Sequence, residues 1–146
     1  KKLSKLKCCI TLFFLLCVLL ADSNLRLTVT EYHIQSQRVP DAFVGYRIVQ
    51  LSDLHAMEFG EHNRRLVQKV TKLEPDMIAL TGDFIESPED LPVVAALVSE
   101  LSQIAPVYFS SGNHDWASKC IGDLRNAVDL NGGKYLSNEH LLLERV

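Results

Sequence analysis

Three short polar clusters contain the residues of this chain that are best suited to chemistry. Each follows an apolar run, and about 30 residues separate one cluster from the next, as a strand, a crossover helix and a returning parallel strand require. Side chains at the carboxyl ends of neighbouring parallel strands converge on one crevice. The spacing therefore predicts a single site built from Asp53-Leu54-His55, Gly82-Asp83 and Gly112-Asn113-His114-Asp115.

The residue types in these clusters are metal ligands. Asp53 and His55 are two positions apart, so on an extended segment a carboxylate oxygen and an imidazole nitrogen face the same side. Asp83 follows a glycine, which allows a close approach, and its two oxygens can bridge two ions. Asn113 offers a carbonyl oxygen. Oxygen and nitrogen donors without thiolates suit Mn, Fe or Zn, so the clusters predict two divalent metal ions.

Two such ions suggest a reaction at phosphorus. A pair of ions about 3.5–4 Å apart can activate a water molecule and stabilise an in-line displacement. We expect His114 to lie beside the ions and to give a hydrogen bond or a proton to the leaving oxygen, with Asp115 orienting its imidazole. Asp53 and His55 alone have an ordinary structural explanation, because polar residues at strand ends often cap helices. Only their combination favours a metal site.

Regular elements must bring the clusters together, and the hydrophobic patterns indicate which ones. Strands are predicted over residues 25–35, 46–51, 77–80, 107–109 and 136–146. Helices are predicted over residues 61–73, 87–101 and 118–130, and the second begins with Ser87-Pro88-Glu89-Asp90, a favourable helix start. The alternation of strands and helices predicts an α/β sheet with at least three parallel strands.

The first 24 residues have a different composition from the rest. Lysines precede an uncharged run over residues 8–21, whose length is closer to a signal-peptide core than to the roughly 20 residues of a membrane span. Ala21-Asp22-Ser23 is a loose cleavage site, whereas counting from Leu3 lengthens the helix. Residues 1–24 are therefore predicted to be a signal peptide or a signal anchor, which puts a membrane-anchored or exported domain on the non-cytoplasmic side.

Composition restricts the remaining part of the chain. A length of 146 residues allows one ordinary domain. A net charge of −3 argues against a nucleic-acid partner held by a basic coat. The chain has neither a dinucleotide-binding glycine motif nor a P-loop, which argues against a nucleotide-binding domain. Cys120 is the one cysteine beyond the first 24 residues, so no internal disulfide framework is expected there.

Asp-x-His, Gly-Asp and Gly-Asn-His-Asp in this order, within residues 49–84 and 107–116, resemble the calcineurin-like metallophosphoesterase family. The similarity is strongest to its membrane-tethered bacterial branch and covers about residues 25–146. By this resemblance, Asp53 and His55 bind the first metal, Asp83 bridges, Asn113 binds the second and His114 assists the phosphate transition state. The resemblance also implies a fold of two packed sheets, a sandwich flanked by helices.

One departure from the family pattern limits these expectations. The family has two further ligand motifs downstream, Gly-His and Gly-His-x-His, and neither occurs before Val146. We therefore expect residues 25–146 to be the N-terminal portion of a metallophosphoesterase domain, truncated at its C-terminal side. As a full-length protein it would hydrolyse a phosphomonoester, a phosphodiester or a lipid-linked pyrophosphate, while the fragment itself would show little turnover. The alternative is an inert, membrane-anchored domain with partial metal binding.

Overall fold

The computed structural model describes residues 2–145, without the side chains of residues 2–5, 8 and 21–25. It divides into two compact units, Lys1–Ile34 and Gln35–Val146. Of the predicted basic flank, Lys1 lies outside the described residues, and so do the side chains of the predicted cleavage site at residues 21–23.

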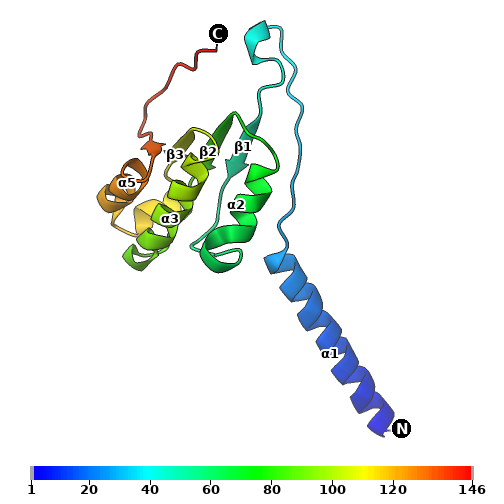
Figure 1. Ribbon diagram of the computed structural model, residues 1–146. Helices are drawn as coiled ribbons and strands as arrows, with labels where there is room; N and C mark the ends of the chain where they lie inside the picture. The colour runs from blue at the N-terminus through cyan, green and yellow to red at the C-terminus, as the bar shows by residue number, and fades with distance from the viewer. Residues whose placement is uncertain (1, 146) are drawn as a thin grey trace. The chain divides into compact units, whose positions relative to one another are not determined.

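The first unit contains one long helix, α1 (Lys2–Leu25), drawn in blue in Figure 1. Its described apolar side chains are exposed, including Phe13 at 68% and Phe14 at 70%. Within the described part of the chain, no helix combines the length and the apolar character needed to cross a membrane.

The strand predicted over residues 25–35 is wrong. Residue 25 ends α1, and residues 26–36 have no regular structure and mostly exposed side chains. Their alternating pattern fits an edge strand, but a strand becomes stable only when another strand or helix covers it. Among the described strands none pairs with this segment, so the pattern has no partner to stabilise it.

The second unit is built on one parallel sheet, visible at the centre of Figure 1. Its spatial order is the chain order: β1 (Ile48–Leu51), β2 (Met77–Thr81), β3 (Val107–Ser110) and β4 (Gly133–Tyr135). All three pairings are parallel, which confirms the predicted α/β fold. Within residues 2–145 the strands form this single sheet, so the second sheet implied by the resemblance is not seen in this part of the fold.

The last predicted strand is displaced. β4 ends at Tyr135, and residues 136–145 have no regular structure. Gly132 has a φ of +88°, which turns the chain, and a Cβ at Gly133 would lie 2.8 Å from Val128 and 2.9 Å from Val98. The two glycines therefore let the chain enter the sheet directly after the preceding helix, earlier than the apolar pattern suggests.

Helices follow the strands in alternation. They are α2 (Arg64–Thr71), α3 (Leu91–Ser102), α4 (Asn113–Ala117) and α5 (Ile121–Asp129), with short 3₁₀ turns η1 (Asp41–Phe43), η2 (Glu61–Asn63) and η3 (Pro88–Asp90). The predicted start at Ser87 is confirmed, because its side chain and that of Asp90 form a capping box. The helix predicted over 118–130 begins later, at Ile121, after Lys119 adopts a φ of +61°.

The core lies between the sheet and the helices α2, α3 and α5, and α3 contacts both of the other two. Ile78, Leu80 and Phe109 point into it and are fully buried. The other face of the sheet is less covered, and Met77, Tyr108 and Leu141 are among the residues that line a pocket of about 300 Å³ there.

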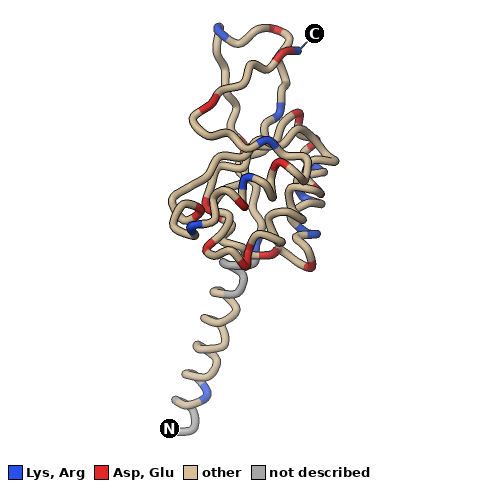
Figure 2. The backbone as a smooth tube through the Cα atoms, turned by 90° about the vertical axis from the view of Figure 1, so that its left-hand side faces the viewer, with Lys and Arg blue, Asp and Glu red and all other residues tan. Residues whose placement is uncertain are grey.

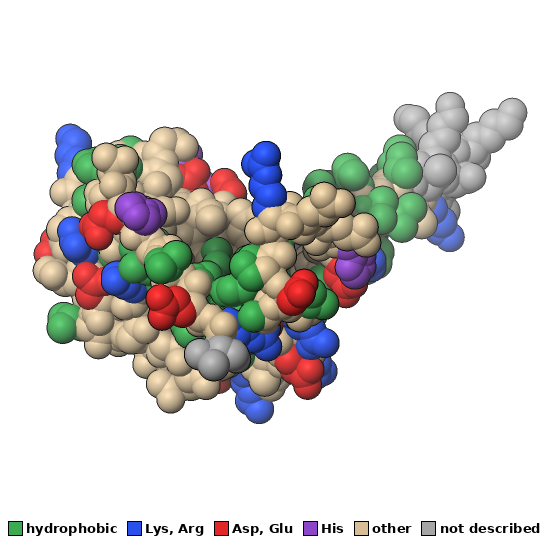
Figure 3. Space-filling model, turned by 90° about the horizontal axis from the view of Figure 1, so that it is seen from above, with side chains coloured by type: hydrophobic (Ala, Val, Ile, Leu, Met, Phe, Trp, Pro, Cys, Tyr) green, Lys and Arg blue, Asp and Glu red, His purple; other side chains and the backbone are tan. Residues whose placement is uncertain are grey.

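Acidic and basic residues are intermixed along the backbone of the chain (Figure 2). The face shown in Figure 3 likewise carries blue and red side chains side by side around apolar ones. On the face shown in Figure 3, the basic side chains do not form a continuous surface of the kind that tracks a phosphate backbone.

Candidate metal centre

The loops that leave β1, β2 and β3 meet at one edge of the sheet. Register aligns Leu51 with Leu80 and Leu80 with Phe109, so the strands end at the same level. Backbone hydrogen bonds then join the first two loops: the Asp53 N–H donates to the Gly82 carbonyl at 3.0 Å, and the His55 N–H to the Asp83 carbonyl at 3.0 Å. The clusters are therefore neighbours, as the spacing predicts.

Asp53, His55 and Asp83 converge closely enough to share an ion. One ligand atom from each lies within 4.8 Å of the other two. The donors are two carboxylates and an imidazole, which is the oxygen and nitrogen chemistry that Mn, Fe and Zn accept. The described side chains thus fit a divalent metal, while the roles assigned to each residue stay predictions.

The backbone at these residues is not extended, contrary to the expectation for Asp53 and His55. Their φ angles are 57° and 47°, and Ala56 and Asp83 have φ angles of 55° and 59°. Non-glycine residues in this left-handed region cost on the order of 1–3 kcal/mol each and are concentrated at functional sites. Loop geometry, rather than strand alternation, brings the two ligands together.

Two glycines allow the second and third clusters to touch. Gly82 has a φ of +87°, and a Cβ on it would overlap the backbone of Gly112, whose own Cβ would overlap the Asp83 carboxylate. Because neither atom is present, Asp83 reaches the start of α4, where its Oδ1 accepts the His114 backbone N–H at 2.9 Å. The absence of side chains at the two glycines thus allows the Asp83 carboxylate to lie directly beside the third cluster.

Asp115 joins two of the loops through their backbone amides. It is fully buried, and its two oxygens accept backbone N–H groups from both loops: Gly112 and Asp83 at 2.9 Å, Phe84 at 2.8 Å and Ile85 at 3.0 Å. Backbone amides thus engage the Asp115 carboxylate, while Nδ1 of His114 lies 3.0 Å from Glu86, so the orientation of the His114 imidazole by Asp115 stays a prediction. Asp115 fastens the loop after β2 to the loop after β3.

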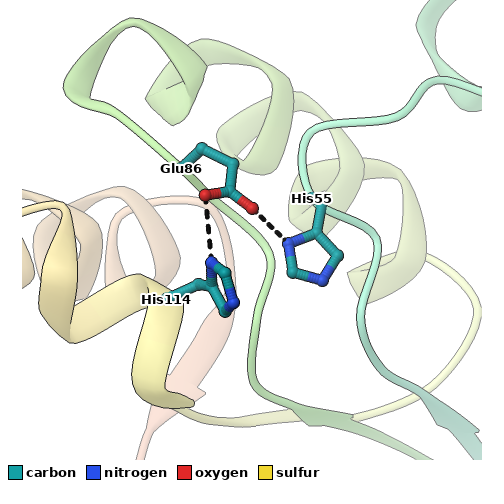
Figure 4. A group of neighbouring side chains, drawn as sticks. All are labelled: His55, Glu86 and His114. Carbon is teal, nitrogen blue, oxygen red and sulfur yellow. Dashed lines mark hydrogen bonds and ion pairs between the residues drawn. The ribbon is translucent and has the colours of Figure 1, made fainter.

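Glu86 is the residue that sequence reasoning missed. Its Oε1 lies 2.5 Å from Nδ1 of His55 and its Oε2 lies 3.0 Å from Nδ1 of His114, so one carboxylate stands between the two rings (Figure 4). The rings meet edge to face, with centroids 4.7 Å apart. His55, Glu86 and His114 form a second group near enough to hold an ion. Its sequence signal is weak: an acid three residues after Asp83.

Glu86 and His114 influence each other's protonation. The His114 hydrogen bond, followed by that of His55, lowers the pKa of Glu86 below its ordinary value. In return, the hydrogen bond to Glu86 raises the pKa of His114. Their side chains are 51% and 43% exposed, so solvent screens the attraction and the pair adds little stability. Its main consequence is the orientation of the rings.

Three other residues near the site differ in how exposed their side chains are. Asn113 is the first residue of α4 and its side chain is exposed, so its role as ligand to a second ion stays a prediction. Trp116, which follows the third cluster, is 59% exposed. Cys120 is buried.

Comparison with known proteins identifies the family to which this site belongs. The sequence profile of the family described as calcineurin-like phosphoesterase matches residues 46–143, which include all three clusters. The chain belongs to this family. Its members use divalent metal ions, in agreement with the donors gathered at the carboxyl ends of β1, β2 and β3.

Individual relatives are similar to large parts of this chain. The uncharacterized metallophosphoesterase YkoQ of Bacillus subtilis is 35% identical over 103 residues, 66% of this chain and 38% of YkoQ. The transmembrane protein with metallophosphoesterase domain of Danio rerio is 27% identical over 77% of this chain and 26% of its own length. The UDP-2,3-diacylglucosamine pyrophosphatase LpxG of Chlamydia muridarum is 31% identical over 63% and 30%. The matched part of the chain thus spans between 26% and 38% of the length of these relatives.

Proposed function

We propose that the full-length protein is a metal-dependent phosphoester hydrolase whose site begins with Asp53, His55 and Asp83. The observation that carries this proposal is the convergence of these three side chains, whose ligand atoms lie within 4.8 Å of one another, beside a histidine bonded through its backbone to Asp83. When bound, a pair of Mn, Fe or Zn ions would supply an activated water and polarise the phosphoryl oxygens.

Each residue has a distinct part in this mechanism. Asp53 and His55 would hold the first ion, Asp83 would be shared with a second ion, and Asn113 would supply an amide oxygen to that second ion. Nδ1 of His114 is engaged by Glu86, which leaves Nε2 to hand a proton or hydrogen bond to the leaving oxygen. Asp115 acts indirectly, by holding the Asp83 and His114 loops together through backbone amides.

The substrate class in this proposal is a phosphomonoester, a phosphodiester or a lipid-linked pyrophosphate. Two relatives named UDP-2,3-diacylglucosamine pyrophosphatase support the last of these. Residues 1–24 would be a signal peptide or a signal anchor, and residues 25–146 the N-terminal portion of the catalytic domain on the non-cytoplasmic side. Relatives named as transmembrane proteins support an association with membranes.

His114→Ala tests the proposed chemistry in the full-length protein. Because the imidazole acts on the leaving oxygen rather than on a metal, we expect kcat for an aryl phosphate to fall by about 10²–10⁴-fold, while Mn²⁺ affinity changes little. The measurement is initial rates at saturating Mn²⁺, with calorimetry for the metal.

His140→Ala is the matched control, because His140 is an exposed histidine outside the three clusters. Its kcat should equal that of the unmodified protein. A His114→Ala enzyme with a kcat within threefold of the unmodified value would contradict the role given to His114.

A further inference from the structure

Tyr135 joins the fourth strand to the loop that carries the third cluster. It is the last residue of β4, and its side chain is buried. Its hydroxyl donates a hydrogen bond to Oγ of Ser111 at 2.9 Å. Ser111 directly follows β3 and comes two residues before Asn113, the predicted ligand of a second ion. A buried hydroxyl from β4 thus reaches the start of the loop that bears Asn113.

The ring of Tyr135 is held by contacts that do not involve its hydroxyl. It stacks on Phe109, with centroids 5.6 Å and planes 17° apart, and the Arg125 guanidinium lies 5.7 Å from its centroid. The Tyr135 backbone N–H donates to Oδ1 of Asp129 at 2.8 Å. Because these contacts fix the ring, the hydroxyl holds Ser111 from a rigid part of the fold.

A second contact to the same loop comes from Gly82. A Cβ on this glycine would overlap the Gly112 nitrogen and would lie 3.0 Å from the Ser111 carbonyl carbon. The peptide between Ser111 and Gly112 therefore packs closely against the loop after β2. Backbone packing from one neighbouring loop and a hydrogen bond from β4 together determine where this peptide lies.

The hydrogen bonds further along the loop go to carboxylates that have other partners. The His114 backbone N–H donates to Oδ1 of Asp83, and Asp83 is itself a proposed metal ligand. The Asp115 carboxylate is shared among amides of two loops. The Tyr135 hydroxyl, in contrast, belongs to no predicted ligand. Its hydrogen bond to Ser111 can therefore persist whether or not ions are bound.

We propose, on the basis of the proposed function, that Tyr135 is a positioning residue for the second metal ion. Its hydroxyl acts through Ser111, which fixes the start of the loop, and the loop in turn places the side chain of Asn113. A ligand that is already in place when the ion arrives loses less freedom on binding. Loss of the hydroxyl therefore lowers the affinity for the ion more than the rate of the fully loaded enzyme.

Tyr135→Phe and Ser111→Ala each remove one partner of this hydrogen bond. Phenylalanine keeps the stacking on Phe109, and Ser111 is only half-buried, so we expect both variants of the full-length protein to fold. Tyr108→Phe is the matched control, because Tyr108 lines the pocket on the other face of the sheet and loses the same hydroxyl there.

Amide hydrogen exchange in the metal-free protein measures how firmly the loop is held. We expect Tyr135→Phe to accelerate exchange at Gly112 and His114 by about three- to tenfold, the size that loss of one hydrogen bond produces. A general loss of stability would accelerate the amides of β1 as well, and we expect these to stay unchanged. Ser111→Ala should have the same effect, and the double variant should add little to it, because both changes break one bond.

Metal dependence gives a second readout. In Tyr135→Phe, the Mn²⁺ concentration that gives half of the maximal rate with an aryl phosphate should rise by about three- to tenfold. The rate at saturating Mn²⁺ should stay within about twofold of the unmodified rate, since the missing hydroxyl affects placement of the ligand and not the chemistry. Calorimetry with Mn²⁺ should show the same weakening, and Tyr108→Phe should match the unmodified protein in both measurements.

The exchange measurement needs neither metal nor turnover, so it tests the hold of Tyr135 on the loop even if the protein hydrolyses no phosphoester. Faster exchange confined to the loop in both single variants, together with weaker Mn²⁺ binding, supports the proposal. It is overturned if exchange at Gly112 and His114 in Tyr135→Phe stays within twofold of the unmodified rates, if the amides of β1 accelerate equally, or if Mn²⁺ binds with the unmodified affinity.

Discussion

Asp83→Asn is expected to abolish metal-dependent hydrolysis by the full-length protein and to weaken Mn²⁺ binding by about 10²-fold, or about 2.7 kcal/mol. Asparagine is nearly the same size and keeps an oxygen for the His114 backbone N–H. It lacks the negative charge and the second oxygen that can face a second ion. Calorimetry measures the binding, and initial rates with an aryl phosphate measure the activity.

Asp123→Asn is the control for this change. Asp123 is an exposed acid in the first turn of α5, so it loses the same charge away from the site. We expect it to bind Mn²⁺ and turn over like the unmodified protein. Normal Mn²⁺ affinity and normal rates in Asp83→Asn would show that Asp83 is not a metal ligand.

Asp115→Ala is expected to cause the largest loss of stability, about 3–5 kcal/mol, because buried donors without partners are costly. The carboxylate is fully buried and accepts four backbone N–H groups from two loops. Alanine would leave these donors unpaired within the fold. Since domains have a total stability of about 5–15 kcal/mol, this loss is a large fraction of it. Urea unfolding followed by circular dichroism measures the change.

Two further variants serve as controls for the loss of stability expected in Asp115→Ala. Asp115→Asn retains one acceptor oxygen and should lose less than Asp115→Ala, whereas Asp123→Ala at an exposed position should change the free energy of unfolding by less than about 1 kcal/mol. If Asp115→Ala unfolds at the same urea concentration as Asp123→Ala, the backbone amides do not depend on Asp115.

The arrangement of the sheet could be predicted because its signals are local. Apolar runs near Leu51, Leu80 and Phe109 specify strands, and about 30 residues between them specify parallel connections. Ser87 and Asp90 specify a helix start through their own capping contacts. Together these local features were sufficient to bring the three polar clusters to one edge.

The roles within the site depend on contacts between loops, which no local pattern contains. Asp115 reaches backbone amides more than 25 residues away in sequence, and adjacency to His114 suggested a simpler partner. Glu86 matters only because two rings from other loops reach it. The left-handed backbone of Asp53 and His55 likewise accompanies hydrogen bonds to the neighbouring loop, which no local pattern contains.

Removal and return of metal tests the central proposal most directly. The full-length protein is treated with a chelator, dialysed and assayed with an aryl phosphate before and after addition of Mn²⁺. The proposed function predicts no hydrolysis by the metal-free protein and recovery of the initial rate when Mn²⁺ is restored, with no recovery in Asp83→Asn. Hydrolysis that continues at the same rate in the metal-free protein would contradict it.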